Sequence, residues 1–206
     1  MKNFEIETTW VAEPGDIVYI PPGIAHHGES TDNECITLSI GYRSYSANEM
    51  LESLELIRDD DNNSYYKDPL WLDQQGSAEI PNSAIEKLIK LTKNSKLSDT
   101  FFGCFVTKLD PLDEEKLNDV VAFNSPLIIK DSVTYSLHPL SRIAYQFIDK
   151  VLVVFLNGNT LQINDIHDDL IIDFCNTRRI KVTAINKALA IQFSALLLLE
   201  ETRPNN

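Results

Sequence analysis

Cysteine is scarce in this sequence. Three cysteines, Cys35, Cys104 and Cys175, are spread over 206 residues, and no Cys-x-x-Cys pair occurs. An odd number of widely spaced cysteines does not suit a disulfide framework. We therefore predict that these residues are buried free thiols in a protein of the reducing cytoplasm.

Basic residues are also few. The chain has 18 lysines and arginines against 31 acidic residues, which gives a formal net charge of -13 and a pI near 4.6. Nonspecific nucleic-acid binding depends on cationic neutralisation of phosphates, so this composition argues against it. The charge is compatible with electrostatic steering of a basic partner, but solubility alone would explain it equally well.

Long apolar runs are missing too. The longest tract, residues 188–199, is interrupted by Gln192 and Ser194 and is too short to span a bilayer. The sequence has no internal repeat, no phosphate-binding loop and no G-x-S-x-G elbow. With 43% hydrophobic and 24% charged residues, the composition is typical of a soluble globular protein with one or two cores.

The most informative stretch is residues 13–28, which read EPGDIVYIPPGIAHHG. Gly15 is followed by five residues, then by Pro21, one residue, Gly23, two residues and His26. This G-x5-P-x-G-x2-H spacing is that of the second metal motif of cupin barrels. The pattern predicts a metal-binding role for His26.

Elementary chemistry agrees with this motif. Gly15 and the next residue favour a turn, and residues 17–20 form an apolar, β-branched run that predicts a short strand. Proline and glycine end that strand. A neutral imidazole at His26 is then a common ligand for iron and zinc. Since neighbouring strand residues face opposite ways, His27 would point away from the metal.

Residues 13–28, followed by ITLSIGYR at residues 36–43, resemble the JmjC-type cupins of the bacterial ribosomal oxygenase family. The resemblance implies an Fe(II)- and 2-oxoglutarate-dependent dioxygenase that hydroxylates an arginine of a large-subunit ribosomal protein. It also implies that His26 is the last of three iron ligands. Thr37 and Ser39 would lie on one face of the strand that lines the 2-oxoglutarate pocket, and Arg43 is a weaker candidate for the same pocket.

The sequence departs from the family in its other metal ligands. The family supplies them as His-x-Asp upstream of this motif, whereas residues 1–25 contain no histidine. The only His-x-Asp is His167 to Asp169, which we predict to be a solvated helix face. The chain is thus expected to be the C-terminal portion of an oxygenase, and to be inactive by itself because two of three ligands are absent.

The predicted fold class is α+β with three regions. Residues 1–46 would be the last strands of a cupin barrel (double-stranded β-helix), with strands near residues 4–11, 17–20 and 34–42. Residues 47–124 would be a helical linker and dimerisation region, and residues 125–206 a winged-helix-like domain.

Capping signals place the helices of the middle region. S-x-x-E boxes begin at Ser46 and Ser83, and Ser98 or Asp99 could cap a third helix. Asp110-Pro111 would end that third helix, and a fourth is expected over residues 113–123.

The C-terminal region has its own signals. Strands are expected over residues 141–148 and 150–156, joined by Asn157-Gly158, a strong type I′ signal, to residues 160–163. Asn164 would cap a helix with Arg178 near its C-terminus, and a helix over residues 186–195 would precede a last strand at 196–200.

Three functions remain open from the sequence. The first is the C-terminal portion of the hydroxylase described above, and the family relation implies a homodimer. The second is a non-catalytic dimerisation or protein-interaction module. The third is a winged-helix transcription factor, which the acidic charge disfavours.

Overall fold

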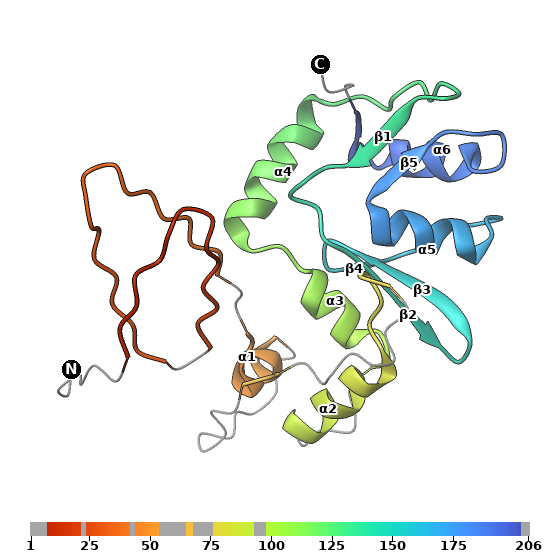
Figure 1. The fold of residues 1–206 in the computed structure, drawn as a ribbon. Helices are drawn as coiled ribbons and strands as arrows, with labels where there is room; N and C mark the ends of the chain where they lie inside the picture. Colours follow the sequence, from red (N-terminus) through yellow and green to blue (C-terminus); the bar gives the residue numbers. More distant parts are fainter. Residues whose placement is uncertain are drawn as a thin grey trace. The chain divides into compact units, whose positions relative to one another are not determined.

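The computed structural model of the chain describes residues 8–21, 24–41, 44–53, 65–67, 76–92 and 98–202. The chain divides into two compact units, Met1–Tyr42 and Arg43–Asn206, which we call the first and the second unit. All of the labelled helices and strands in Figure 1 belong to the second unit. Within the described residues, no helix is both long and apolar enough to cross a membrane.

The first unit forms turns and extended loops. In its described residues no strand is assigned, so the strands predicted over residues 17–20 and 34–42 are not formed there. Part of the strand predicted near residues 4–11 lies outside the described residues. A strand needs a neighbour for its backbone hydrogen bonds and for one side-chain face. Ile17 and Ile36 have no packed neighbour on the side-chain face within the described residues, because they are 96% and 94% exposed.

The second unit opens with helix α1 (Ala47–Glu52), and its predicted capping box is confirmed. The amide of Glu49 donates to Ser46 Oγ at 3.2 Å, and the Ser46 amide donates to Glu49 Oε2 at 2.8 Å. These two bonds satisfy donors that a helix start leaves free. Met50 and Leu51 are buried, as their spacing predicts.

Helix α2 (Asn82–Thr92) begins two residues earlier than its predicted capping box requires. Ser83 therefore lies within the first turn, and the prediction that it caps the helix is wrong. The Ala84 amide instead donates to the carbonyl of Pro81 at 2.9 Å. Ala84 and Leu88 form the buried face of α2.

Helices α3 (Phe101–Thr107) and α4 (Pro111–Phe123) follow. Thr100, not Ser98 or Asp99, is the N-cap of α3. Asp110-Pro111 does separate the two helices, but it also starts α4 two residues before the predicted position. Asp110 is the N-cap and Pro111 occupies the first turn, where its fixed φ and missing N–H are tolerated.

The cap of α4 predicts a dependence of stability on pH. The Asp113 amide donates to Asp110 Oδ1 at 3.0 Å and, with Arg142 nearby, lowers the pKa of the Asp110 carboxyl. A carboxyl with a lowered folded-state pKa stabilises the fold above its unfolded-state pKa, and this contribution is lost as the pH falls through the folded-state value. We expect the unfolding free energy of Asp110→Asn, which keeps an acceptor but no charge, to fall less steeply with acid than that of the wild type. Denaturant titrations over a range of acidic pH would measure both slopes, and identical slopes would contradict the prediction.

Two antiparallel sheets make up the C-terminal part, and both contain three strands. One has the order β5-β1-β6, and the other the order β2-β3-β4. The strands are β1 (Thr134–Leu137), β2 (Ile143–Ile148), β3 (Val151–Leu156), β4 (Asn159–Leu161), β5 (Arg179–Lys181) and β6 (Leu199–Glu201). The predicted hairpin is confirmed, because Asn157 and Gly158 join β3 to β4 with φ of 49° and 86°.

Helices α5 (Asp168–Thr177) and α6 (Lys187–Ala195) are also close to their predicted ranges. His167, not Asn164, is the N-cap of α5. Asn164 instead exchanges backbone hydrogen bonds with the side chain of Gln192 on α6, at 3.3 and 2.9 Å. That contact is distant in sequence, which is why a local pattern cannot predict it. The winged-helix-like arrangement stays a prediction.

The sheet β2-β3-β4 lies between α3 and α5 (Figure 1). Its neighbouring residues Ala144 and Tyr145 point to opposite faces. Accordingly, Ala144 belongs to a core cluster with Phe102 of α3, and Tyr145 belongs to a second cluster with Phe174 of α5. The sheet therefore contributes to both cores of the second unit.

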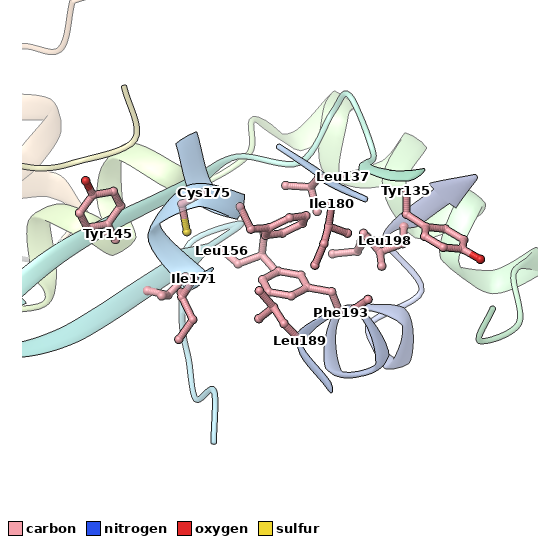
Figure 2. Packing of buried hydrophobic residues seen from close by; sticks show 14 of the residues in the cluster. Tyr135, Leu137, Tyr145, Leu156, Ile171, Cys175, Ile180, Leu189, Phe193 and Leu198 are labelled. Carbon is pink, nitrogen blue, oxygen red and sulfur yellow. The ribbon is translucent and has the colours of Figure 1, made fainter. Parts of the chain in front are cut away.

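The larger core cluster is centred on aromatic rings (Figure 2). Phe174 and Phe193 are each 1% exposed, and their ring centroids lie 4.4 Å apart. Leu109 and Leu117, which precede the boundary predicted after residue 124, belong to the same cluster. The division of residues 47–206 into two domains stays a prediction, and both core clusters contain residues from each side of it.

A short segment, residues 78–80, pairs with the outer edge of β2. The Ile80 amide donates to the Tyr145 carbonyl at 2.7 Å, and the Tyr145 amide donates to the Ala78 carbonyl at 2.8 Å. Asn176 Oδ1 accepts from the Ala78 amide at 2.9 Å. A Cβ at Gly76 would lie 2.3 Å from Asn176 Nδ2, so a larger residue there would displace the Asn176 side chain that accepts from Ala78.

Candidate functional site

The candidate site is built on two successive turns of the first unit. The Asp16 amide donates to the Glu13 carbonyl at 3.0 Å, and the Glu13 amide donates to Asp16 Oδ2 at 2.9 Å. Gly15 has φ of +99°, a value that glycine adopts without strain. The turn predicted at Gly15-Asp16 is therefore confirmed.

The second turn leads into His26. The Ile24 amide donates to the carbonyl of Pro21 at 3.3 Å, and His26 Nδ1 lies 3.1 Å from the carbonyl oxygen of Ile24. A carbonyl can only accept, so Nδ1 carries the proton and donates it. In the neutral ring the Nε2 lone pair is then free, which is the tautomer that a metal-ligating histidine needs. Nε2 of His26 has no hydrogen bond within the described residues.

His27 has a different contact. Its Nε2 lies 3.3 Å from Glu29 Oε1, and both side chains are exposed. The two neighbouring rings therefore differ in chemistry. A carbonyl partner orients His26, whereas His27 is paired with a carboxylate.

The residues predicted for the co-substrate pocket are described only in part. Thr37 and Ser39 lie in an extended loop and are exposed, and Arg43 lies outside the described residues. Nor, in the segments that the structure describes, does any hydrogen bond join His26 to Thr37 or Ser39. Their assignment to one pocket stays a prediction.

The described residues do not supply a complete iron site. A facial triad consists of two histidines and a carboxylate. Nowhere among the described residues do three histidine, cysteine, aspartate or glutamate side chains gather in a way that could hold a metal. His167, Asp168 and Asp169 are exposed at the start of α5, as predicted. The assignment of His26 as one ligand of an iron centre stays a prediction.

Burial makes two of the thiols, Cys104 and Cys175, poor nucleophiles. Burial raises the pKa of Cys175 to about 12 and raises that of Cys104 from its ordinary value. Cys35 is exposed and Cys104 is half-buried, so the prediction that all three are buried holds only for Cys175. Cys35 is exposed because the loop that contains it has no packed face.

Arg178 has a role that the sequence suggested only in part. It was expected near the end of α5, where cations suit the helix dipole, and it is the C-cap in a left-handed conformation with φ of 57°. Its Nη2 donates to three carbonyls, those of His138 (3.1 Å), Pro139 (3.4 Å) and Ser141 (2.7 Å). Burial lowers the pKa of this guanidinium from its ordinary value. Arg178 therefore holds the loop between β1 and β2 through Nη2.

Comparison with known proteins shows what the chain resembles. The family model of the JmjC domain matches residues 1–50, which contain the two turns and His26. The chain is similar to ribosomal protein uL16 3-hydroxylase from Escherichia coli (strain K12), with 28% identity over 102 residues, which are 47% of this chain. The match covers 27% of that relative, so the chain spans about a quarter of its length. No solved structure matches the chain. The chain is thus similar to the JmjC-type ribosomal oxygenases, and residues 1–50, which match the JmjC domain model, contain the His26 motif.

Proposed function

We propose that this chain is the C-terminal portion of an Fe(II)- and 2-oxoglutarate-dependent oxygenase resembling the ribosomal protein arginine hydroxylases. The observation that carries the proposal is the contact between His26 Nδ1 and the Ile24 carbonyl, inside the residues that match the JmjC domain. This contact leaves Nε2 as a ready metal ligand. Thr37 and Ser39 would donate hydroxyl hydrogen bonds to the carboxylate of 2-oxoglutarate, with Arg43 as a further cation.

The iron centre, when complete, supplies the oxidising chemistry with dioxygen and 2-oxoglutarate. This chain contributes one imidazole from its described residues and a hydroxyl-bearing segment after it. One imidazole does not hold iron tightly, because a facial triad needs two further ligands. We therefore assign no oxidation step to these 206 residues by themselves.

A metal titration tests the role of His26. We expect the purified chain to bind Fe(II) or Co(II) weakly under anaerobic conditions, and His26→Ala to reduce that affinity by about tenfold or more, or ~1.4 kcal/mol. His27→Ala is the matched control, because it removes the neighbouring ring and should leave the affinity near that of the wild type. Equal losses in both variants would contradict the assignment of His26.

A turnover assay tests the incomplete ligand set. We expect the same chain, supplied with iron and 2-oxoglutarate, to form no succinate detectable by NMR. Succinate formation that disappears in His26→Ala would overturn the proposal that the chain is inactive by itself. It would still support the assignment of His26 as a metal ligand.

The partners of the chain follow from the same proposal. A basic ribosomal protein would complement the net charge of -13, and the family relation makes a homodimer and a cytoplasmic location natural expectations. Sedimentation over a range of protein concentrations would test the dimer.

A second candidate function is a non-catalytic interaction module. It is favoured by large apolar side chains that project from the second unit, of which Phe123 at the end of α4 is 90% exposed and Ile128 is 85% exposed. Exposed apolar groups of this size occur at protein interfaces. A strict monomer at high concentration would weigh against this candidate.

A further inference from the structure

The turn between β3 and β4 contains a reactive dipeptide, Asn157-Gly158, whose reacting groups are held by hydrogen bonds to neighbouring residues. An asparagine followed by glycine is the sequence most prone to cyclisation, because glycine leaves the next backbone nitrogen unhindered. The same pair is favoured in a type I′ turn, because both residues need positive φ. Gly158 is further constrained, since a Cβ there would lie 3.3 Å from Lys108 Cα. The residues that suit this turn are therefore also those that suit the side reaction.

Both reacting groups are engaged by neighbours. The Gly158 amide donates to Thr107 Oγ1 at 3.1 Å, and Asn157 Oδ1 accepts from the Arg142 amide at 2.8 Å. Asn157 is held on its other side too, because its own amide donates to the Arg142 carbonyl at 3.0 Å. The Gly158 nitrogen, which would be the nucleophile, is thus hydrogen-bonded to the last residue of α3. The Asn157 carboxamide, which would be the electrophile, is hydrogen-bonded to the residue before β2.

Thr107 is itself held in place. It is 2% exposed, and its hydroxyl donates to the Gly103 carbonyl one turn back at 2.8 Å. A hydroxyl that donates to the helix can still accept from Gly158, so one side chain links α3 to the turn. Loss of this acceptor would leave the Gly158 N–H free to lose its proton to solvent base.

We propose that Asn157 is a latent deamidation site, and that Thr107 and the Arg142 backbone suppress the reaction as long as α3 stays packed on the β3–β4 turn. When the contact opens, the Gly158 nitrogen loses a proton and attacks Asn157 Cγ. The bond from Cγ to the side-chain nitrogen breaks and ammonia leaves. Water then opens the cyclic imide to aspartate or to isoaspartate.

Deamidation would change the local structure, because isoaspartate adds a carbon to the backbone of a two-residue turn. The pairing of β3 with β4, which begins at Leu156 and Asn159, would lose its register. The fraction of modified Asn157 should therefore increase with the time that α3 spends detached from the β3–β4 turn.

The test is the rate of deamidation in the full chain, followed by peptide mass spectrometry and by isoaspartyl methyltransferase labelling at mildly alkaline pH. We expect the native chain to react much more slowly than the same chain in denaturant. We expect Thr107→Val, which keeps the shape but removes the acceptor, to react about tenfold faster than the native wild type, in line with the loss of one buried hydrogen bond. Thr107→Ser, which keeps the hydroxyl, should react at close to the wild-type rate.

Thr92→Val is the matched control. Thr92 is also buried at the last position of a helix, and its hydroxyl donates to the Leu88 carbonyl at 2.9 Å, but it contacts no reactive turn. Equal acceleration in Thr92→Val and Thr107→Val would overturn the proposal in favour of general destabilisation, as would a wild-type rate in Thr107→Val. If Thr107→Val does not fold, the wild-type deamidation rates in native and denaturing conditions provide the test. Equal rates in the two conditions would also overturn the proposal.

Discussion

Phe174→Ala is expected to lower the free energy of unfolding of the second unit by about 3–5 kcal/mol. The Phe174 side chain is 1% exposed and packs against the Phe193 ring with centroids 4.4 Å apart. Its removal forfeits the transfer free energy of a whole ring and leaves a cavity between α5 and α6, which the surrounding residues fill only in part. Denaturant unfolding followed by far-ultraviolet circular dichroism would measure the change.

Phe123→Ala provides the control for this experiment. Phe123 is the same residue type at the end of α4, but it is 90% exposed. Its substitution should change the unfolding free energy by less than about 0.5 kcal/mol. A loss below about 1 kcal/mol in Phe174→Ala would contradict the core position of that ring.

Gly103→Ala is the second substitution with a large expected effect. In an ordinary helix this change is favourable by about 1 kcal/mol, because alanine has the higher helix propensity. Here a Cβ at Gly103 would lie 2.3 Å from Phe155 Cε2, and Phe155 is fully buried. Overpacking of this kind costs about 1–3 kcal/mol, so the clash should outweigh the gain in propensity. Thermal and denaturant unfolding should both show a less stable protein.

A double-mutant cycle identifies the cause of that loss. Phe155→Leu is destabilising by itself, but it makes room beside α3, so Gly103→Ala should cost less in the Phe155→Leu background than in the wild type. Gly28→Ala is the comparison for glycine replacement as such, because nothing lies within 4 Å of a Cβ there. Additive effects of the two core substitutions would show that the clash with Phe155 is not responsible.

Local signals in the sequence predicted much of the second unit. The capping box at Ser46 and the Asn157-Gly158 hairpin depend on residues within four positions of one another, and both are confirmed. The predicted helix caps at Ser83 and Asn164 are wrong for reasons that a local pattern does not contain. Helix α2 starts two residues earlier than a cap at Ser83 requires, and Asn164 is engaged by Gln192 from a distant helix.

The candidate site shows the same limit. The spacing around His26 depends on a few neighbouring residues and predicted its local turns. A metal centre needs ligands that are far apart in sequence, and a strand needs a partner for its backbone. Neither requirement is met for His26 within the described residues of the first unit, where residues 24–41 form no ladder. The motif therefore predicts the family and one ligand, whereas the full site depends on non-local contacts.

The pairing of residues 78–80 with β2 has a consequence for solubility. An open strand edge presents unpaired N–H and C=O groups, and other chains can add to it as they do in amyloid. Because Ala78 and Ile80 already occupy the outward hydrogen-bonding groups of Tyr145, the middle of the β2 edge is closed to a further strand. We therefore expect residues 78–80 to hinder the addition of another chain at this position of β2.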